Sequence, residues 1–556
     1  MFWRSHTSRS ITLPWLTDLR LKMKIGTDQM DWREEIELKL RVDPDGVANI
    51  HQSDWWRELG AGTRKRLHRI YFDTSDRRLR HLDISLHTRT DGRDTIQTVK
   101  MTNGGPVGAV HREWETLVPD AVPDPTLVID AALPQEFRKL TAPDLQPVFN
   151  ADITRETRYL ESNGTKIELS FEEGAVTSGQ QRHNVREVEL KLVSGELAQL
   201  FAEARRLSQL AAGRLHSCTL SDLGYGLVRT KPRHWSRAQS LRLTTGMTAG
   251  DALNTIVRNC FEHLTVNDDC ARLNLHPEGV HQCRVALRRL TSLFKIYEAR
   301  LRRNRLEPIV AEVRWLGNVL GLARDLDVLQ GDLLEVASSA LGASGQLEPL
   351  TARLNENKTR AYSAVWEALS SSRYRHFLVD LCAFDCGDYR GLCSSSLGPD
   401  ALDQPLPRFA ASALAGAHRK LLKRGRAFET LPQSERHRVR IALKKLRYAV
   451  DFFGGLFDQE RQARFSKSLA RLQEDLGRMN DVAVAETRLA QLISGSVDDS
   501  PEPLARPEWQ GKLAFAVGCV LGWHHRRAVE INERLIKDWS SFLRAKPFWQ
   551  GQQSVE

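Results

Sequence analysis

The sequence lacks any long uninterrupted apolar run. Hydrophobic residues make up 41% of its 556 positions, and no stretch approaches the roughly 20 consecutive apolar residues of a membrane-spanning helix. Residues 1–29 also lack the apolar core of a secretory signal. The sequence therefore predicts a soluble protein with no membrane partner. We interpret residues 1–29 as a disordered or extra segment, with Met30 or Met23 as the natural start, and an organelle transit peptide as the alternative.

The sequence also lacks the cysteine pairs that bind zinc or carry out redox chemistry. Its eight cysteines include no Cys-x-x-Cys pair and no zinc-ligand spacing. Cys382 and Cys386 fit one face of a helix, where we interpret them as buried free thiols. Cysteines scattered along a long chain are typical of a reducing compartment. We therefore expect the protein to be cytoplasmic.

Positive charge is in excess, with 80 Lys and Arg residues against 70 Asp and Glu residues and a net charge of +10. Such a balance favours anionic partners, which include nucleic acid, polyphosphate, nucleotides and acidic surfaces. Composition alone does not choose among them. A chain of 556 residues is too long for a single hydrophobic core, so we expect two or more domains.

A ten-residue segment recurs 156 residues later in the chain. Residues 281–290 read HQCRVALRRL, and residues 437–446 read HRVRIALKKL. A Leu-Gly pair follows each copy at the same distance, at 320–321 and at 476–477. A single offset shared by several motifs indicates an internal duplication.

Each copy of the repeat predicts a helix with one cationic face and one apolar face. At about 100° per residue, the histidine and the cations of a copy share one sector and the large apolar residues share the opposite sector. No acid is interleaved, so the cations repel one another, and an anionic ligand would supply the missing charge. An ordinary solvated face is the alternative. The residues predicted to bind a polyanion are His281, Arg284, Arg288, Arg289, Lys295, His437, Arg440, Lys444 and Arg447.

Three acids near the repeat are candidates to brace its arginines. They are Asp325, Asp327 and Asp481. Asp325 and Asp481 also fit the alternative of a helix-terminus residue, because Asp is favoured at that position.

The N-terminal part, from residue 34 to about 228, reads as an antiparallel sheet or barrel. Short alternating runs are broken by Gly, Pro and Asp. Residues 35–40 read EIELKL and residues 187–192 read EVELKL, and a period of two places the Glu and Lys positions on one face. If Glu35, Glu37, Glu187 and Glu189 converge in the lumen, a hard divalent cation would relieve their repulsion.

Cations suited to the same lumen lie between these two strands. They are Arg89, Lys100, Arg112, Arg155 and Arg158. Carboxylates that hold Mg²⁺ or Mn²⁺ beside cations that hold phosphate oxygens suit a metal–polyphosphate substrate. For a single Glu-x-Glu-x-Lys strand, a solvated outer face is the alternative.

Two sets of short motifs resemble known domain families. The first set comprises Glu35-x-Glu37-x-Lys39, Tyr71-Phe72-Asp73-Thr74, Thr98-Val99-Lys100, Arg112-Glu113-Trp114-Glu115 and Glu187-x-Glu189-x-Lys191. It resembles the CYTH domain of the triphosphate tunnel metalloenzymes. The second set comprises His281-Gln282-x-Arg284-Val285-x-Leu287-Arg288-Arg289-Leu290, Arg324-Asp325-x-Asp327-Val328 and Lys444-Lys445-Leu446-Arg447-Tyr448. It resembles the CHAD domain, and the order of the two resembles bacterial inorganic triphosphatases.

The resemblance implies an α+β multidomain protein. An eight-stranded antiparallel tunnel would hydrolyse inorganic triphosphate, or a related triphosphate, with Mg²⁺ or Mn²⁺, and an all-α pseudosymmetric bundle would bind inorganic polyphosphate. Glu35, Glu37, Glu187 and Glu189 would hold the metal. The implied phosphate-binding residues are Lys39, Arg89, Lys100, Arg112, Arg155 and Arg158, of which Lys39, Arg89 and Lys100 would be catalytic.

The sequence departs from the family pattern in the predicted tunnel. His87 stands where the family usually has an arginine, and Leu220 and Leu223 stand where it has cations. The family's late Asp-x-Gly appears here as Glu172-Glu173-Gly174. A catalytically degenerate, granule-associated polyphosphate-binding protein is therefore the second hypothesis. Nucleic-acid binding ranks last, because the basic helices lack interleaved aromatics for stacking.

The predicted domain plan follows from these boundaries. It consists of residues 1–29 as an N-terminal segment, 30–228 as the CYTH tunnel, 229–240 as a linker, 241–540 as the CHAD bundle and 541–556 as a tail.

Overall fold

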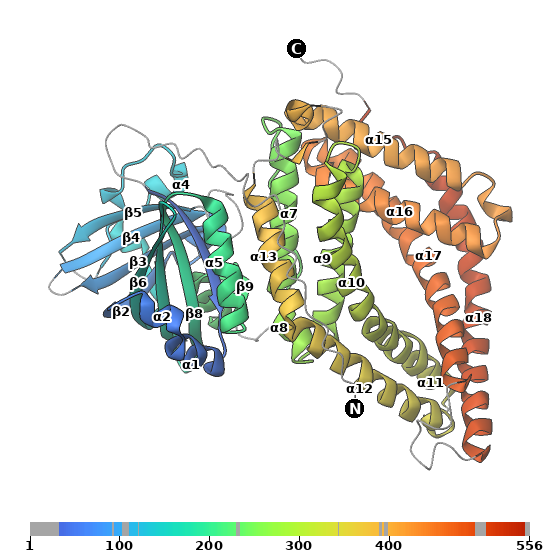
Figure 1. Cartoon of the computed structure of the whole chain (residues 1–556). Helices are drawn as coiled ribbons and strands as arrows, with labels where there is room; N and C mark the ends of the chain where they lie inside the picture. Colours follow the sequence, from blue (N-terminus) through green and yellow to red (C-terminus); the bar gives the residue numbers. More distant parts are fainter. Residues whose placement is uncertain are drawn as a thin grey trace. The chain divides into compact units, whose positions relative to one another are not determined.

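The computed structural model describes most of the chain (Figure 1). The described residues are 33–91, 94–102, 111–119, 122–228, 234–342, 344–387, 392–393, 398–494 and 507–550. The predicted segment 1–29 lies outside them. The predicted linker 229–240 and tail 541–556 lie partly outside them, and in the described part residues 234–240 form no helix or strand while the last helix ends at Leu543.

The chain divides into two compact units. The first comprises the residues up to 232 together with 375–392, and the second comprises 233–374 and 393–556. Helix α13 (Ser372–Cys386) therefore begins in the second unit and continues in the first. In the first unit, Arg375 Nε donates to the carbonyl oxygen of Ser208 at 2.9 Å, and Asp380 forms an ion pair with Arg205. These contacts join α13 to helix α5 (Leu197–Leu210).

The first unit is built on one antiparallel sheet of nine strands in the order β5-β4-β3-β2-β6-β7-β8-β1-β9. The strands are β1 (Arg33–Arg41), β2 (Thr63–Asp73), β3 (Ile84–Asp91), β4 (Asp94–Thr102), β5 (His111–Val118), β6 (Gln146–Ser162), β7 (Thr165–Ser178), β8 (Gln181–Ser194) and β9 (Arg214–His216). A further pairing joins β1 to β5 along Arg33–Glu35.

The α+β fold class is confirmed, but the predicted tunnel of eight strands is corrected. The ninth strand is β9, a short strand that pairs with the second half of β1. It was not recognised because three residues are too few to show an alternating pattern. In the described residues, β5 at one end of the sheet also pairs with β1, the strand beside β9 at the other end, along Arg33–Glu35.

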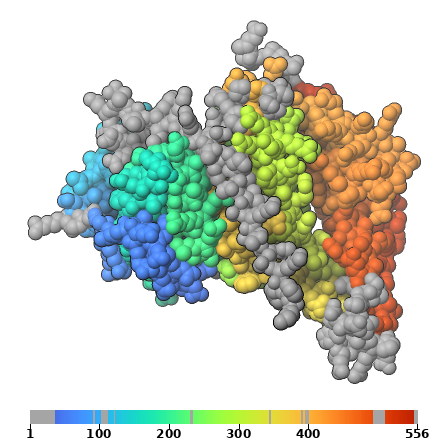
Figure 2. Space-filling view, viewed as in Figure 1, coloured from blue at the N-terminus to red at the C-terminus, as the bar shows by residue number. Residues whose placement is uncertain are grey.

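On β1, strand alternation gives a polar inner face and an apolar outer face. On β1, Ile36, Leu38 and Leu40 are buried on the face that α5 covers. Glu37 and Lys39 point to the other side, because successive side chains of a strand alternate. Figure 2 shows the segment with helices α1 (Pro44–Gln52) and α2 (Asp54–Glu58), in blue, on the surface of this unit.

Helix α6 (Leu220–Leu227) packs against an apolar part of the sheet, where it contacts β6, β7 and β8. Its Leu220 and Tyr225 join Tyr71 and Phe149 in one buried cluster. A Cβ atom on Gly224 would lie 2.2 Å from the Phe149 ring, so only glycine permits this close approach. The leucine that replaces a family cation is therefore core packing.

The remaining helices of the first unit are short, apart from α13. They are α3 (Arg78–His81), α4 (Gln135–Arg138) and the 3-10 turns η2 (Pro125–Leu127) and η3 (Ala142–Asp144). The second unit is helical. Its helices are α7 (Ala249–Thr265), α8 (Asp268–Arg272), α9 (Pro277–Tyr297), α10 (Arg303–Val328), α11 (Glu335–Leu341), α12 (Glu348–Ser370), α15 (Leu406–Arg424), α16 (Gln433–Phe453), α17 (Gln459–Ser494) and α18 (Pro507–Leu543). Between them lie η4 (Leu329–Leu334), η5 (Ser344–Gln346), η6 (Pro399–Leu402), η7 (Phe428–Thr430) and η8 (Gly454–Leu456).

The helix boundaries of the second unit repeat with the period of the sequence. Helices α9 and α16 start 156 residues apart (433 − 277) and end 156 residues apart (453 − 297). Helices α10 and α17 also start 156 residues apart (459 − 303). The corresponding helices pack in pairs, α9 against α16 and α10 against α17. The repeat therefore brings its two copies side by side.

The described helices include none with both the length and the low polarity required to cross a bilayer. The longest are α17 and α18, and α18 has no Asp, Glu, Lys or Arg between Lys512 and Arg526 but many in its second half.

Candidate active site and anion surface

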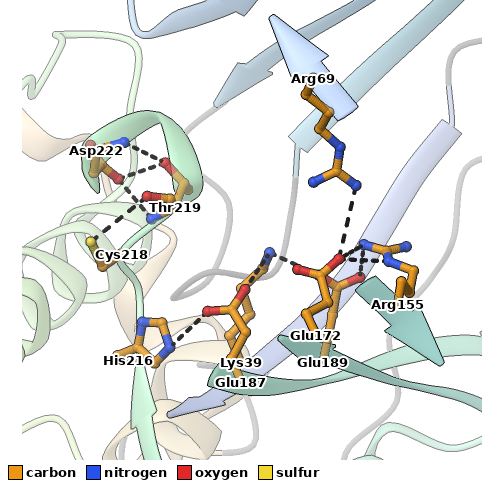
Figure 3. A network of polar contacts seen from close by, with 10 residues as sticks. All are labelled: Lys39, Arg69, Arg155, Glu172, Glu187, Glu189, His216, Cys218, Thr219 and Asp222. Carbon is orange, nitrogen blue, oxygen red and sulfur yellow. Dashed lines mark hydrogen bonds and ion pairs between the residues drawn. The ribbon is translucent and has the colours of Figure 1, made fainter. Parts of the chain in front are cut away.

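The inner face of the sheet carries a cluster of buried carboxylates (Figure 3). Glu172 lies on β7, and Glu187 and Glu189 lie on the adjacent strand β8. Their residues are 0%, 4% and 3% exposed, and each offers an oxygen within 4.8 Å of the other two. Because buried carboxylates repel one another, the cluster needs nearby cations to remain ionised.

Two cations from neighbouring strands contact these carboxylates. Lys39 Nζ lies 2.8 Å from Glu189 Oε2 and 3.8 Å from Glu187 Oε1. Arg155 Nη2 lies 2.5 Å from Glu172 Oε1 and 3.6 Å from Glu189 Oε1. Strand register sets these pairs, since Lys39 is opposite Glu189 and Arg155 is opposite Glu172.

The contacts keep both signs of charge ionised at neutral pH. Burial alone would raise the pKa of Glu187, but Lys39 and His216 outweigh burial and hold that pKa below its usual value. Burial would likewise raise the pKa of Glu189, and Lys39 and Arg155 lower it. Burial would lower the pKa of Lys39, but the surrounding glutamates raise it well above its usual value. The cluster is therefore a buried ion network.

Three of the four predicted metal ligands share this inner face. Glu187 and Glu189 lie in the cluster, and Glu37 is 3% exposed on β1, where its charge acts on the pKa of Lys39. Glu35 also lies on β1, but its side chain lies outside the described part of the structure. Sequence analysis did not assign Glu172 to the metal set. The alternation of β7 places Glu172 on one face of that strand. Only the pairing of β7 with β8 shows that this face brings Glu172 close to Glu187 and Glu189.

The donor atoms of the cluster fit a hard divalent cation. Carboxylate oxygens are the ligands that Mg²⁺ and Mn²⁺ prefer. Glu172 Oε2 is buried and has no hydrogen-bond partner among the described residues. The residues that would hold such a cation are Glu172, Glu187 and Glu189. A cation there would compete with Lys39 and Arg155 for the same oxygens.

A second group on the inner face is cationic. Arg69 on β2, Arg89 on β3 and Lys100 on β4 surround His87, and all three act on its pKa. Arg89 Nη2 and Lys100 Nζ each lie 2.9 Å from a glutamate of β5. The predicted phosphate-binding residues Arg89 and Lys100 therefore lie together. Arg69 was missed, because β2 reads TRKRLHRIYFD and its many basic residues hide which ones face inward.

The structure does not bring Arg112 and Arg158 to this group. Arg112 is opposite Met101, on the face of β5 that carries the buried Trp114, and so it points away from Lys100. Arg158 donates to the carbonyl oxygen of Trp56 at 2.6 Å, and its guanidinium lies 4.4 Å from the centre of that indole ring.

His216 on β9 is a further buried residue beside the carboxylates that sequence analysis missed. It is 7% exposed, and its Nε2 lies 3.4 Å from Glu187 Oε2. Neither ring nitrogen has a hydrogen-bond partner among the described residues, so the pair is an electrostatic contact. Burial lowers the pKa of His216, although Glu187 opposes that effect.

In the second unit, the cationic faces of α9 and α16 converge. The charges of Arg284 and Arg288 on α9 act on the pKa of Lys444 on α16. Arg440 lies beside Lys444, and Arg288 acts on its pKa as well. The Nε atoms of Arg288 and Arg440 are buried without a hydrogen-bond partner in the described residues. We call Arg284, Arg288, Arg440 and Lys444 the repeat cluster.

The repeat cluster has too few acids to neutralise it. Burial, Arg440 and Arg288 lower the pKa of Lys444 to about 7. Among the described residues, Asp481 Oδ1 lies 4.0 Å from Arg440 Nη2, and the charge of Asp325 acts on Arg284. Lys444 is therefore only partly charged at neutral pH, and an added anion would favour its protonated form.

The Leu-Gly of the repeat has a steric role in the first copy. Arg284 Nη1 donates to the carbonyl oxygen of Gly317 on α10 at 3.2 Å. A Cβ atom on Gly321 would lie 2.6 Å from that nitrogen. Glycine at this position therefore lets the Arg284 guanidinium lie across α10.

Other predicted polyanion-binding residues make separate contacts. His281 is near the cluster, since Arg284 and Arg288 act on its pKa, which burial lowers first. The other four lie elsewhere. On α9, Arg289 packs 5.6 Å from the Phe452 ring centre and Lys295 pairs with Glu298. On α16, Arg447 lies 3.9 Å from Asp451, and His437 Nδ1 lies 2.8 Å from Asn480 Oδ1. His437 lines an open pocket of about 630 Å³.

The three acids expected to brace the arginines make different contacts. Asp481 approaches Arg440, and the charge of Asp325 acts on Arg284, although the contact of Asp325 is with Arg488 at 3.3 Å. Asp327 instead binds α12: its Oδ2 accepts from the Tyr362 hydroxyl at 2.8 Å, and its Oδ1 lies 2.9 Å from Lys358 Nζ.

Family models and relatives agree with the two-unit architecture. A model of the CYTH domain matches residues 33–220, and a model of the CHAD domain matches residues 255–490. The chain is 27% identical over 168 residues to the inorganic triphosphatase of Haemophilus influenzae, a match that covers 30% of this chain and 47% of that protein. It is 25% identical over 454 residues to an uncharacterised protein of Mycobacterium tuberculosis, covering 77% and 82% of the two chains.

Among solved structures, the chain is similar to the crystal structure of the CHAD domain from the plant Ricinus communis. The identity is 29%, the match covers 56% of this chain and 98% of that domain, and the TM-score is 0.46. The family models carry the assignment. The chain therefore consists of a CYTH domain followed by a CHAD domain.

Proposed function

We propose that the CYTH domain hydrolyses inorganic triphosphate, or a related triphosphate, with Mg²⁺ or Mn²⁺, and that the CHAD domain binds inorganic polyphosphate. The observation that carries the first part is the buried ion network, in which Glu172, Glu187 and Glu189 lie beside Lys39 and Arg155 on one inner face. The partial match to a protein named inorganic triphosphatase supports it.

The carboxylates of the inner face would bind the metal ion, and the cations of that face would bind phosphate oxygens. Bound Mg²⁺ or Mn²⁺ would neutralise phosphate charge and make a nearby water more acidic. Glu172, Glu187 and Glu189 would hold that cation. Lys39 and Arg155 would then exchange their carboxylate partners for phosphate oxygens, since both ligands are anionic and within reach of the same side chains.

The cationic group around His87 would stabilise the remaining phosphate charge. Arg69, Arg89 and Lys100 come from three adjacent strands, so their positions are fixed before a substrate arrives. Preorganised cations of this kind supply most of the rate acceleration in phosphoryl transfer, because they need little rearrangement as charge develops in the transition state.

A matched pair of variants on β7 tests the proposal. Glu172 faces the network, whereas Glu173 faces outward, is 50% exposed and pairs with Arg186. We expect Glu172→Gln to reduce phosphate release from tripolyphosphate by at least 10²-fold with Mg²⁺ or Mn²⁺. Glu173→Gln removes the same charge from the same strand and should retain the wild-type rate. Equal rates for the two variants would refute the metal-dependent mechanism.

A second matched pair tests polyphosphate binding. Arg440 belongs to the repeat cluster, whereas Arg438 on the same helix is 64% exposed and pairs with Glu435. We expect Arg440→Gln to weaken polyphosphate binding by about tenfold or more in a filter-binding assay, since a charge-assisted contact contributes about 1.5–3 kcal/mol. Arg438→Gln should bind as the wild type does. Binding that is weakened equally by both changes would indicate a diffuse charge effect only.

A catalytically degenerate polyphosphate-binding protein is the second candidate, and it would fit a place at cytoplasmic polyphosphate granules. The burial of Leu220 in an apolar cluster favours it, because a cation at that position would otherwise add positive charge to the inner face. Absence of turnover of any triphosphate, with polyphosphate binding intact, would select it. Competition with DNA separates both from a nucleic-acid binder, because DNA should lose to short polyphosphate at equal phosphate concentration.

A further inference from the structure

His87 occupies an unusual position on the inner face of the CYTH domain. It lies on β3, opposite Tyr71 on β2 and Thr98 on β4. The imidazole is 4% exposed, and its centre lies 4.8 Å from the centre of the Tyr71 ring. The ring is therefore held in place by packing on one side and faces the polar interior on the other.

Cations act on His87 from every strand around it. They are Arg69 on β2, Arg89 on its own strand and Lys100 on β4, and each opposes protonation of the imidazole. Tyr71 is the titratable neighbour on β2, and its own pKa is raised by burial, so its hydroxyl stays neutral. Burial and these cations hold the pKa of His87 well below its ordinary value. The empty site therefore contains a neutral imidazole.

One ring nitrogen of His87 lacks a hydrogen-bond partner in the described part of the chain. That atom, Nδ1, is buried. A buried polar atom without a partner is unfavourable, and native structures rarely contain one without a reason. The three cations beside the ring are each paired with a carboxylate, Arg69 with Glu172, Arg89 with Glu115 and Lys100 with Glu113. A bound anion would exchange with those carboxylates, and its oxygens would accept a hydrogen bond from the imidazole.

We propose that His87 is a specificity-determining residue that contacts a phosphate oxygen of the bound triphosphate and takes up one proton from solvent as the triphosphate binds. The inference rests on the function proposed for the CYTH domain. In the empty site the ring is neutral; in the occupied site it is an imidazolium that donates to the phosphate. The proton comes from the buffer, and no covalent bond of the substrate changes in this step.

Proton uptake has a direct consequence for affinity. A ligand that adds one proton to the protein binds up to tenfold more tightly for each unit by which the pH falls, by linkage. A fixed positive charge at the same place would take up no proton, so its affinity would follow only the ionisation of the ligand. His87 would thus make the triphosphate affinity of the domain depend on pH in the range where cytoplasmic pH varies.

Calorimetry measures the proton uptake without relying on turnover. The full chain is titrated with the imido analogue of triphosphate and Mg²⁺ at pH 7.0, in two buffers of different ionisation enthalpy. We expect the wild type to take up as much as one proton more than His87→Gln per analogue bound. His87→Arg carries a permanent charge and should show no extra uptake, and its affinity should change less between pH 6.5 and 8 than that of the wild type. Equal uptake by the wild type and His87→Gln would overturn the inference.

A second measurement uses the wild type alone, so its result does not depend on whether a variant folds. With ¹³C-labelled histidine, the His87 ring signal should shift to the imidazolium position when the analogue is added at pH 7.0. Tight binding with an unchanged His87 signal would overturn the inference while leaving the triphosphatase proposal intact. Failure of the analogue to bind any variant, together with absent turnover, would instead remove the proposed function on which the inference rests.

Discussion

Lys39 is expected to stabilise the CYTH domain and, at the same time, to compete with a divalent cation. Its Nζ lies between Glu189 and Glu187, at 2.8 Å and 3.8 Å, and its side chain is 17% exposed. Removing one partner of a buried ion pair costs about 3–5 kcal/mol, because the other charge is left without compensation. We therefore expect Lys39→Met to lower the free energy of unfolding of this domain by about 3–5 kcal/mol in metal-free buffer.

Thermal unfolding of the full chain in EDTA measures this loss. For a domain of about 200 residues, 1 kcal/mol corresponds to about 2–4 °C, so the Tm of the CYTH transition should fall by about 6–20 °C. The matched control is Lys166→Met on β7. Lys166 Nζ lies 2.7 Å from Glu161 Oε1, but the two side chains are 41% and 67% exposed. An exposed pair of this kind contributes less than about 1 kcal/mol, so the control should lose only a few degrees.

Addition of Mg²⁺ or Mn²⁺ separates the two roles of Lys39. Without the lysine, Glu187 and Glu189 lose a cation that both contact, and His216 and Arg41 alone oppose the burial of Glu187, so metal should raise the Tm of Lys39→Met more than that of the wild type. A cation at about 100 times its Kd adds about 2.7 kcal/mol, enough to recover much of the loss. The reasoning fails if Lys39→Met and Lys166→Met melt together, or if metal stabilises the wild type more than Lys39→Met.

Two further predictions concern other buried contacts. Burial and Arg440 lower the pKa of Lys444 to about 7, and a bound anion raises it, so polyphosphate affinity should fall as the pH rises from 6 to 8. Lys444→Arg should abolish that slope in the same binding assay, and an unchanged slope would contradict the role of Lys444. Tyr225 donates its hydroxyl to the fully buried Asp73 at 2.5 Å. Tyr225→Phe should cost the CYTH domain about 1.5–3 kcal/mol of stability, measured as a fall in its Tm; an unchanged Tm would refute this.

Strand alternation predicted part of the inner face. Sequence analysis placed four residues on one face: Glu37, Lys39, Glu187 and Glu189. Because one face of β1 is apolar, a period of two assigns the alternate residues to the other face. Arg112 shows the limit of this reasoning. It lies next to Glu113, which pairs with Lys100, and a shift of one residue in assumed phase turns a side chain to the opposite face.

Residues whose roles depend on neighbouring strands could not be predicted. Glu172 and Arg69 reach the network only because β7 lies beside β8 and β2 lies beside β6. His216 depends on β9, which has three residues and no recognisable pattern. Sequence fixes the faces of a strand, whereas sheet order and register are set by pairing over long distances in the chain.

The repeat predicted the position of the repeat cluster in the CHAD domain better than single residues did. An offset shared by two helices implies two related positions, and packing of α9 against α16 brings Arg288 and Arg440 together. The helical wheel did not separate every residue, however. Lys295 shares the sector of Arg288 but lies two turns beyond it and pairs with Glu298. Arg289, also predicted to bind, turns inward to Phe452.

The CYTH and CHAD sites differ in how their charge is balanced. In the CHAD domain the repeat cluster has cations in excess, and a partly neutral Lys444 is the result. In the CYTH domain, Lys39 and Arg155 are already paired with carboxylates, so neither a metal nor a phosphate can bind there without displacing a partner. On the proposed function, a divalent cation would release Lys39 and Arg155, and a phosphate would release the carboxylates. Each ligand would therefore remove a cost of binding the other, and by linkage the two affinities would increase by the same factor.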